Sequence, residues 1–340
     1  MNDIVYYMAT LAVLFCIYNI LTLGLNIQFG YTGILDFAYI TFLAAGAYFA
    51  GVSALPRPGG TDQEYILGLS WPFPLTLALG AVVAGLLGIA VGGTILSRWN
   101  LRSDYLGIVT VAFGTICYDL VGNLTPLFNG WFGLRGIPQP LNRLLNLNPN
   151  TYTLFFLGVC VVIMLVLWLV ANRIYHSPLG RTMRAIREDV DVAATFGKDT
   201  VKVRMLAMCI GCVYAGIAGG LLIEFIGGIA PDSWTTAETF IVWAAMIIGG
   251  QGNNLGAAVG TLLVTVVFIE GTRFLPPVPG HPLLIAAARN IAIGVLLIVT
   301  LRFHPQGLVP ERRARAPRGW QAPGAPMPAS SLSNNPGVGR

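Results

Sequence analysis

The run MLAMCIGCVYAGIAGGLLI at residues 205–223 decides the fold class because it is apolar throughout and contains no charged residue. A helix needs about 20 predominantly apolar residues to cross the hydrocarbon core of a bilayer. Over the whole chain of 340 residues, 55% are hydrophobic and only 10% are charged. A water-facing surface normally requires about 25% charged residues. The sequence therefore predicts an all-α polytopic membrane protein.

Hydropathy predicts about nine transmembrane helices. They cover residues 4–26, 33–55, 73–97, 104–123, 151–173, 205–227, 234–250, 255–274 and 283–301. Lys and Arg gather in the 173–204 loop and in the tail after residue 301. Because basic loops mark the cytoplasmic side, we expect a cytoplasmic C-terminus and, with nine spans, an N-terminus outside.

The basic residues follow membrane topology, so we attribute the net charge of +5 to orientation and expect no nucleic-acid partner. Residues 1–310 are predicted to form the transmembrane domain. Residues 311–340 are rich in Pro, Gly, Ala and Ser, which predicts a disordered cytoplasmic tail. The five cysteines lie in apolar segments and the three histidines are scattered, so we expect no metal site.

Small residues at helical spacing predict close helix contacts. Three G-x-x-x-G pairs occur in three predicted helices: Gly88/Gly92, Gly216/Gly220 and Gly256/Gly260. In lipid, small residues let helix backbones approach and gain van der Waals contact. Together the pairs indicate a compact bundle.

The stretch SPLGRTMRAIREDVDVAATFGKDT at residues 177–200 is charged and lies between two predicted spans. Ser177 is a favourable N-cap, Pro178 suits the first helical position, and Gly197 can end a helix. Apolar residues recur between these signals at helical spacing: Leu179, Met183, Ile186, Val190 and Ala193. The pattern predicts one amphipathic helix over about 177–197, with pairs Arg184–Glu188 and Arg187–Asp191 at i,i+4.

Two interpretations of this helix are open. It could lie on the lipid headgroups or on the underside of its own bundle, as interfacial helices do. Alternatively, it docks into a groove of a cytoplasmic partner. Its acidic residues suit an anionic membrane surface poorly, which favours the partner. The residues expected at that contact are Arg181, Arg184, Ile186, Arg187, Glu188 and Asp189.

Nucleotide binding by this chain is not expected. Residues 197–200, GKDT, lack the earlier glycine and the Ser/Thr after Lys that a phosphate-binding loop requires. Any ATP would therefore be bound by another subunit.

Several motifs, in order along the chain, resemble the LivM-type permeases of bacterial branched-chain amino-acid ABC importers. They are GYTGILDFAYITFLAAGAY (30–48), LRSDYLGIVTVAFGTI (101–116), NGWFGLRGIP (129–138), SPLGRTMRAIREDVDVAATFG (177–197), YAGIAGGLL (214–222), GGQGNNLGAAVG (249–260) and RFHPQGL (302–308). The resemblance covers about residues 30–310. The chain departs from the family pattern at Asp36, Ala38 and Tyr39, at residues 128–130, and at Ala257, and these departures bear on the substrate.

The resemblance implies a vitamin-B12-importer-like (type II) ABC permease bundle in the bacterial inner membrane. Such a permease pairs with a second, LivH-like permease, stands on two cytoplasmic ATPase subunits and receives substrate from an extracytoplasmic binding protein. ATP and Mg would be bound by the ATPase, so the chain needs no cofactor and is not an enzyme. The 177–197 helix would correspond to the coupling helix. Branched-chain or related small amino acids are the implied substrates, with urea or short amides as the alternative.

Charged residues within the predicted spans are candidates for function because each costs roughly 2.5–3.5 kcal/mol at bilayer depth. They are Asp36, Asp119, Glu224, Glu270 and Arg289. We expect Glu270 and Arg289 to form a structural ion pair and Glu224 to reach the outer headgroups. Candidates for the translocation path are Gly30, Tyr31, Gly33, Asp36 and Asp119.

Two other classes of function are alternatives to an ABC permease. A stand-alone ion-coupled transporter would need its own coupling-ion site, for example paired carboxylates or broken helices in a repeat. A membrane-embedded enzyme would need clustered catalytic groups, which the sequence does not offer.

Overall fold

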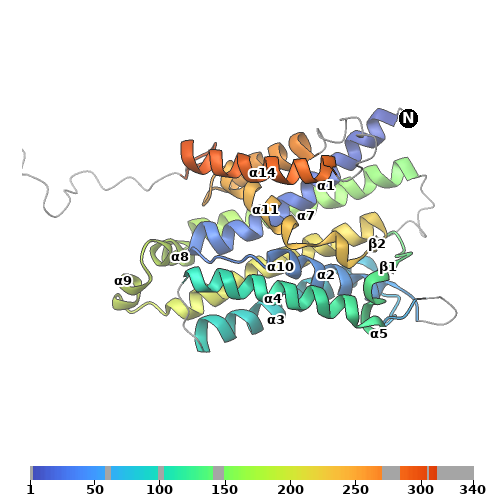
Figure 1. The fold of residues 1–340 in the computed structure, drawn as a ribbon, viewed down its shortest axis with the longest axis horizontal. Coiled ribbons are helices and arrows are strands. Elements are labelled where there is room, and N and C mark those ends of the chain that lie inside the picture. The colour runs from blue at the N-terminus through green and yellow to red at the C-terminus, as the bar shows by residue number, and fades with distance from the viewer. Residues whose placement is uncertain are drawn as a thin grey trace, which may run out of the picture.

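The computed structural model describes residues 3–57, 63–98, 103–140, 149–269, 284–304 and 306–311. They form a bundle of helices (Figure 1). Five helices are long and apolar enough to cross a membrane: 4–31, 73–96, 105–123, 151–176 and 200–226. Shorter apolar helices cover 39–54, 254–266 and 290–303. The chain is therefore a mostly helical, polytopic membrane protein, and the count of nine spans stays a prediction.

The elements follow one another in this order. They are α1 (Asp3–Leu25), π-helical η1 (Asn26–Tyr31), α2 (Tyr39–Ala54), α3 (Phe73–Gly92), π-helical η2 (Gly93–Arg98), α4 (Ser103–Asn123), α5 (Thr125–Phe128), η3 (Gly130–Phe132), β1 (Leu134–Arg135), α7 (Pro149–His176), α8 (Pro178–Glu188), α9 (Val190–Thr195), α10 (Thr200–Ile226), β2 (Gly228–Ile229), η4 (Pro231–Ser233), α11 (Thr236–Gly249), α12 (Asn254–Thr261), π-helical η5 (Leu262–Ile269) and α14 (Leu284–Phe303).

Each range predicted as a span contains helix, but the second helix begins later than expected. The prediction started it at residue 33, whereas α2 begins at Tyr39. Gly33 has φ +71°, a left-handed conformation that ends the preceding helix and favours glycine. Residues 32–38, called here the helix break, separate η1 from α2.

Helix α10 lies at the centre, packed against α2 and α3 through glycines. A Cβ added at Gly216 would lie 2.6 Å from the Cβ of Ala84 and 2.8 Å from the carbonyl oxygen of Gly80. A Cβ at Gly46 would lie 2.4 Å from the Cα of Gly216. The close contacts expected for Gly216 are therefore present, and they bring three backbones together.

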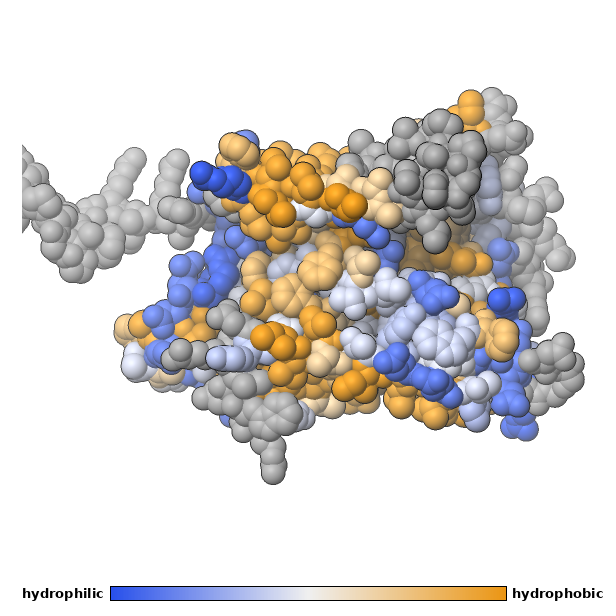
Figure 2. Space-filling view, viewed as in Figure 1, coloured by the Kyte–Doolittle hydropathy of each residue, from blue (hydrophilic) through white to orange (hydrophobic). Residues whose placement is uncertain are grey.

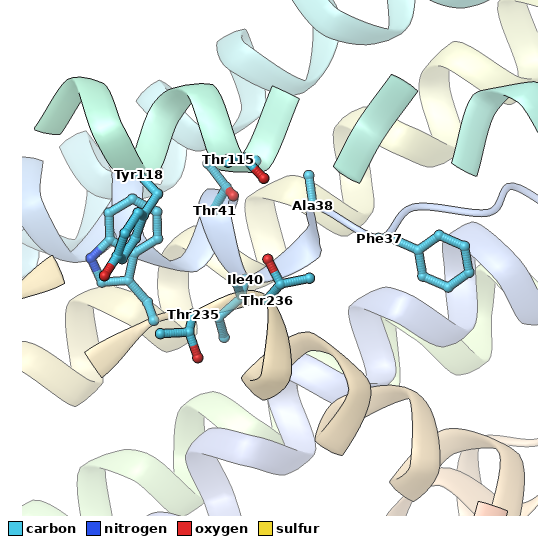
Figure 3. A pocket seen from close by; sticks show the side chains of 10 residues that line it. Phe37, Ala38, Ile40, Thr41, Thr115, Tyr118, Thr235 and Thr236 are labelled. Atoms are coloured by element: carbon cyan, nitrogen blue, oxygen red, sulfur yellow. The ribbon is translucent and has the colours of Figure 1, made fainter. Parts of the chain in front are cut away.

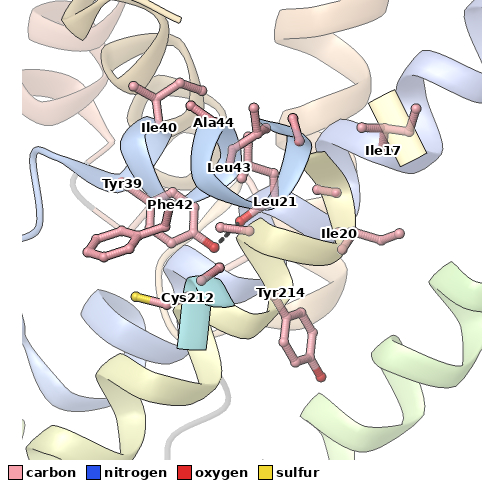
Figure 4. Packing of buried hydrophobic residues seen from close by; sticks show 14 of the residues in the cluster. Ile17, Ile20, Leu21, Tyr39, Ile40, Phe42, Leu43, Ala44, Cys212 and Tyr214 are labelled. Atoms are coloured by element: carbon pink, nitrogen blue, oxygen red, sulfur yellow. Dashed lines mark hydrogen bonds between the residues drawn. The ribbon is translucent and has the colours of Figure 1, made fainter. Parts of the chain in front are cut away.

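Around this contact the core is apolar (Figure 4). One buried tyrosine adds hydrogen bonds between helices. The hydroxyl of Tyr39 is shared by the carbonyl oxygens of Leu21 and Gly211, each at 3.0 Å. A phenol carries one hydroxyl proton, so Tyr39 donates a hydrogen bond to only one of these two carbonyl oxygens at a time. Tyr39 thereby ties the start of α2 to α1 and α10.

The two ends of the bundle differ. Helices α8 and α9 lie at one end, and α5 with the strands β1 and β2 lies at the other (Figure 1). The strands pair antiparallel, with Leu134 opposite Ile229. On the face shown in Figure 2, orange apolar residues cover much of the middle, and blue polar residues gather toward both ends. This distribution suits a protein surrounded by lipid.

Candidate functional site

Helix η1, which precedes the helix break, is attached to the turn between α11 and α12 and to the start of α12 by buried polar side chains. The Asn26 side-chain oxygen accepts a hydrogen bond from the Gly252 amide at 2.8 Å. The Asn26 side-chain nitrogen donates to Asn254 Oδ1 at 3.1 Å, and the Tyr31 hydroxyl donates to the same oxygen at 2.7 Å. All three side chains are buried. Because buried polar groups need partners, this network fixes η1 against α12.

Asp36, in the helix break, is fully enclosed by protein. One carboxylate oxygen accepts a hydrogen bond from the Ala38 amide at 3.0 Å, and the other has no partner. The indole N–H of Trp243 donates to the Asp36 carbonyl oxygen at 3.1 Å. Asp36 therefore lies behind the surface, while its neighbours Phe37 and Ala38 line a pocket.

This pocket has a volume of about 260 Å³ and lies between α4, α2 and the start of α11 (Figure 3). Its walls are Phe37, Ala38, Ile40, Thr41, Gly114, Thr115, Tyr118, Trp234, Thr235 and Thr236. Hydroxyl groups can donate and accept hydrogen bonds, and the remaining walls are apolar. The pocket can therefore hold a small molecule with a polar and an apolar part.

The hydroxyl residues of this pocket were not among the residues predicted from the sequence. Thr115 and Tyr118 come from α4, whereas Thr235 and Thr236 precede or begin α11 (Figure 3). The Tyr118 hydroxyl donates to Asp232 Oδ1 at 3.1 Å, which closes one side. A possible signal was the position of Thr115 and Tyr118 beside Asp119, within one turn of α4.

Asp119 is exposed on the outer surface of α4, one turn after Thr115. The Asn123 side chain donates to the Asp119 backbone carbonyl at 2.8 Å, so it does not neutralise the carboxylate. A carboxylate facing hydrocarbon is costly. The α4 face around Asp119 therefore suits a covering subunit or a water-filled path better than lipid.

The expectation for Glu224 was wrong. Its side chain is only 1% exposed and does not reach outward. Oε1 accepts a hydrogen bond from the Thr76 hydroxyl at 2.6 Å, and Oε2 has no partner. The reason is that α3 packs along α10 and covers this position, which hydropathy could not reveal.

The 177–197 segment forms two helices, not the single one predicted. Ser177 caps α8 as expected, accepting from the Gly180 amide at 3.2 Å. At Asp189 the backbone becomes extended, and its carboxylate accepts from the amides of Asp191 and Val192 at 2.9 and 3.0 Å. Local capping by Asp189 competes with helix continuation, and here it prevails.

The interruption of the helix at Asp189 changes which side chains of residues 177–197 face outward. Met183, Ile186 and Ala193 are buried, whereas Val190, the fourth residue of the predicted stripe, is exposed. Ile186 is 1% exposed and packs on its own bundle. The outward surface is made by Arg181, Glu188, Asp189, Val190, Val192 and Phe196.

The predicted i,i+4 ion pairs of α8 are not formed. Arg187 Nη2 lies 2.7 Å from Glu311 Oε2, and Arg184 Nη1 lies 3.7 Å from Glu311 Oε1. Arg187 also reaches Glu188, at 3.5 Å. Because the helix ends at Glu188, Asp191 is not one turn above Arg187, and both arginines turn toward the C-terminal segment.

The expected pair Glu270–Arg289 lies outside the described part of the chain, since Glu270 and the Arg289 side chain are not described. Among the described residues, no group of His, Cys, Asp and Glu could hold a metal ion.

The chain is similar to known transport permeases. The family described as "Branched-chain amino acid transport system / permease component" matches residues 7–301. The high-affinity branched-chain amino acid transport system permease protein LivM of Escherichia coli K12 is 29% identical, over 89% of this chain and 70% of its own length. A probable LivM permease of Methanocaldococcus jannaschii is 28% identical, over 88% and 92%.

A second type of relative matches more weakly. The probable LivH permease of Methanocaldococcus jannaschii is 26% identical, over 85% of this chain and 87% of its own length. No solved structure matches the chain.

Proposed function

The chain belongs to the family of permease components of branched-chain amino acid transport systems, and on this basis we propose that it is the permease subunit of an ATP-driven importer for branched-chain or related small amino acids. The observation that carries the proposal is the pair α8–α9, which lies between two long apolar helices and has an exposed, mixed surface. Such a surface suits the groove of a soluble partner.

The proposed complex contains a second, LivH-like permease, two cytoplasmic ATPase subunits and an extracytoplasmic binding protein. Likeness to both LivM and LivH permeases supports the pairing. ATP and Mg belong to the ATPase subunits, so this chain itself carries no cofactor.

In this proposal the chain crosses the bacterial inner membrane nine times as a type II permease bundle. The end with α8 and α9 faces the cytoplasm, because Lys and Arg gather there and in the tail. Residues 1–310 form the transmembrane domain, and residues 311–340 form a cytoplasmic tail.

The translocation path is proposed to run along α4, between this chain and the second permease. The exposed carboxylate of Asp119 and the hydroxyl-lined pocket support this choice of face. Gly30, Tyr31, Gly33 and Asp36 of η1 and the helix break then form the wall behind the path and control its opening.

Filling the pocket should block transport without disturbing assembly. In Thr115→Trp, an indole occupies a pocket of about 260 Å³, so we expect uptake to fall about tenfold or more because small-molecule sites depend on shape. The measurement is initial uptake of labelled leucine per assembled complex. Val162→Trp, at an exposed position of α7, is the control. Equal uptake by both variants would place the path elsewhere.

The outward surface of α8 and α9, which we propose contacts the ATPase, offers a substitution that should separate the permease from its ATPase. Phe196 is 78% exposed at the end of α9. Phe196→Asp should reduce co-purification of the ATPase subunits about tenfold or more, because buried aromatic anchors dominate protein interfaces. Phe132 is 73% exposed at the opposite end of the bundle, and Phe132→Asp should retain the ATPase subunits.

The same co-purification tests the proposed function. ATPase subunits and a second permease should accompany the wild-type chain from its native membrane. A chain that purifies alone, and that transports without ATP, would instead be a stand-alone transporter.

A further inference from the structure

The segment that follows α14 folds back over the turn between α11 and α12. Residues 306–311, called here the C-terminal strap, follow α14 closely. The Leu308 amide donates to the Ile248 carbonyl at 2.8 Å, and the Val309 amide donates to the Gly249 carbonyl at 2.9 Å. The Asn253 side chain donates to the Pro310 carbonyl at 3.2 Å. These bonds fix the strap to the end of α11.

The strap ends in a carboxylate that binds the last turns of α7 and α8. Glu311 Oε2 lies 2.7 Å from Arg187 Nη2, and Glu311 Oε1 lies 3.7 Å from Arg184 Nη1. The Tyr175 hydroxyl donates to Glu311 Oε1 at 3.4 Å, and the Arg184 guanidinium stacks over the Tyr175 ring at 4.3 Å. The Glu311 side chain is 19% exposed, and those of Arg184 and Arg187 are 25% and 23% exposed, so solvent screens these partly buried pairs less than it screens fully exposed pairs.

Arg187 has a second contact on its other side. Its Nη1 donates to the carbonyl oxygen of Gly30, in η1. A planar guanidinium can serve two acceptors in a fixed geometry, which the point charge of lysine cannot. Arg187 therefore joins α8 to η1 and to the strap at the same time.

Gly252 packs directly against this contact. A Cβ added at Gly252 would lie 2.8 Å from Glu311 Oε2 and 2.9 Å from Arg187 Nη1. Gly252 also has φ +80° and donates its amide to Asn26, in the network beneath η1. The Arg187–Glu311 pair thus touches both η1 and the α11–α12 turn.

We propose that Arg187 and Glu311 form an internal latch that transmits movement of α8 to the helix break and to the α11–α12 turn. The inference rests on the proposed function, in which ATPase subunits move α8. Arg187 then acts as a positioning residue inside the chain, and the exposed residues of α8 and α9 make the contact with the partner. The C-terminal strap becomes part of the coupling machinery.

The test uses the whole complex and four variants. Glu311→Gln keeps the shape of the side chain and removes its charge. Arg187→Gln removes the guanidinium group that contacts both Glu311 and Gly30, and a double variant combines the two substitutions. Arg302→Gln is the control, because Arg302 is an exposed cation at the end of α14, just before the strap. Two quantities are measured: substrate imported per ATP hydrolysed, and amide hydrogen exchange of residues 26–34 and 249–253.

We expect Glu311→Gln and Arg187→Gln to assemble normally, to hydrolyse ATP and to import about tenfold less substrate per ATP, a size that typical coupling free energies imply. Both should speed exchange in the two segments, and the double variant should be no worse than Arg187→Gln, since partners of one contact are not additive. The control should match the wild type.

Exchange in Glu311→Gln equal to that of the wild type would overturn the latch, as would additive losses in the double variant. The exchange measurement needs no transport. It therefore tests the latch even if the wild-type complex shows no ATP-dependent uptake. The absence of ATP-dependent uptake would reject the proposed function and leave the latch to be decided by the exchange data.

Discussion

Gly216→Val should prevent the bundle from forming its native core. The new Cβ would lie within 2.8 Å of a backbone oxygen of α3 and 2.6 Å from Ala84. Backbone cannot move aside as a flexible side chain can, so α10 must separate from α2 and α3. Overpacking typically costs about 1–3 kcal/mol and occasionally more, and we expect the upper end where backbone blocks the new side chain. The measurement is the thermal midpoint and the monodisperse yield in detergent.

Gly158→Val is the matched control for this prediction. Gly158 is exposed on α7, and a Cβ built there meets no atom within 4 Å. The two variants add the same side chain to a membrane helix and differ only in what surrounds it. Similar midpoints for both would contradict the packing of α10 against α2 and α3 described here.

Asn26→Leu should give the second large effect. It removes the acceptor of the Gly252 amide, which is left buried without this partner, and one of the two donors to Asn254 Oδ1, which keeps only the Tyr31 hydroxyl. Each orphaned group costs about 1–3 kcal/mol. We expect a lower thermal midpoint and increased hydrogen exchange at the α11–α12 turn.

An Asn→Leu substitution at the surface separates the loss of the buried hydrogen bonds of Asn26 from the general effect of replacing asparagine by leucine. Asn290→Leu changes the same residue type at an exposed position of α14, where lipid contact favours leucine, and should leave the midpoint unchanged. An Asn26→Leu protein as stable as the wild type would mean that the buried network contributes little to holding η1 in place.

Hydropathy predicted where helices lie because that signal is local. Each predicted span contains helix, and Ser177 caps α8 as its type and position suggested. Glycines at four-residue spacing likewise predicted the close contacts that Gly216 makes. These features depend on residues within a few turns of one another.

Features that depend on distant residues were not predictable. Arg187 and Glu311 are 124 positions apart, and composition assigned Glu311 to the start of a disordered tail. The burial of Glu224 depends on α3, whose neighbour cannot be read from one sequence. At Asp189 the sequence held two competing signals, a helical apolar stripe and a capping carboxylate, and periodicity alone favoured the wrong one.

For the residues of the proposed translocation path, too, the sequence did not reveal the surroundings that the fold creates. Asp36 and Asp119 were identified as charges at membrane depth, yet they occupy opposite environments, one enclosed and one exposed. The pocket hydroxyls of Thr41, Thr115 and Thr235 come from three segments, so only the fold brings them together.

Uptake by the purified complex in proteoliposomes tests whether this chain is part of an ATP-driven amino-acid importer. We expect labelled leucine to accumulate only when ATP is supplied on the side of the ATPase subunits, and we expect valine and isoleucine to compete for uptake whereas urea and acetamide do not. Competition by urea or acetamide instead would assign the other substrate class. Uptake by this chain alone, driven by a proton or sodium gradient without ATP, would contradict the account and identify an ion-coupled transporter.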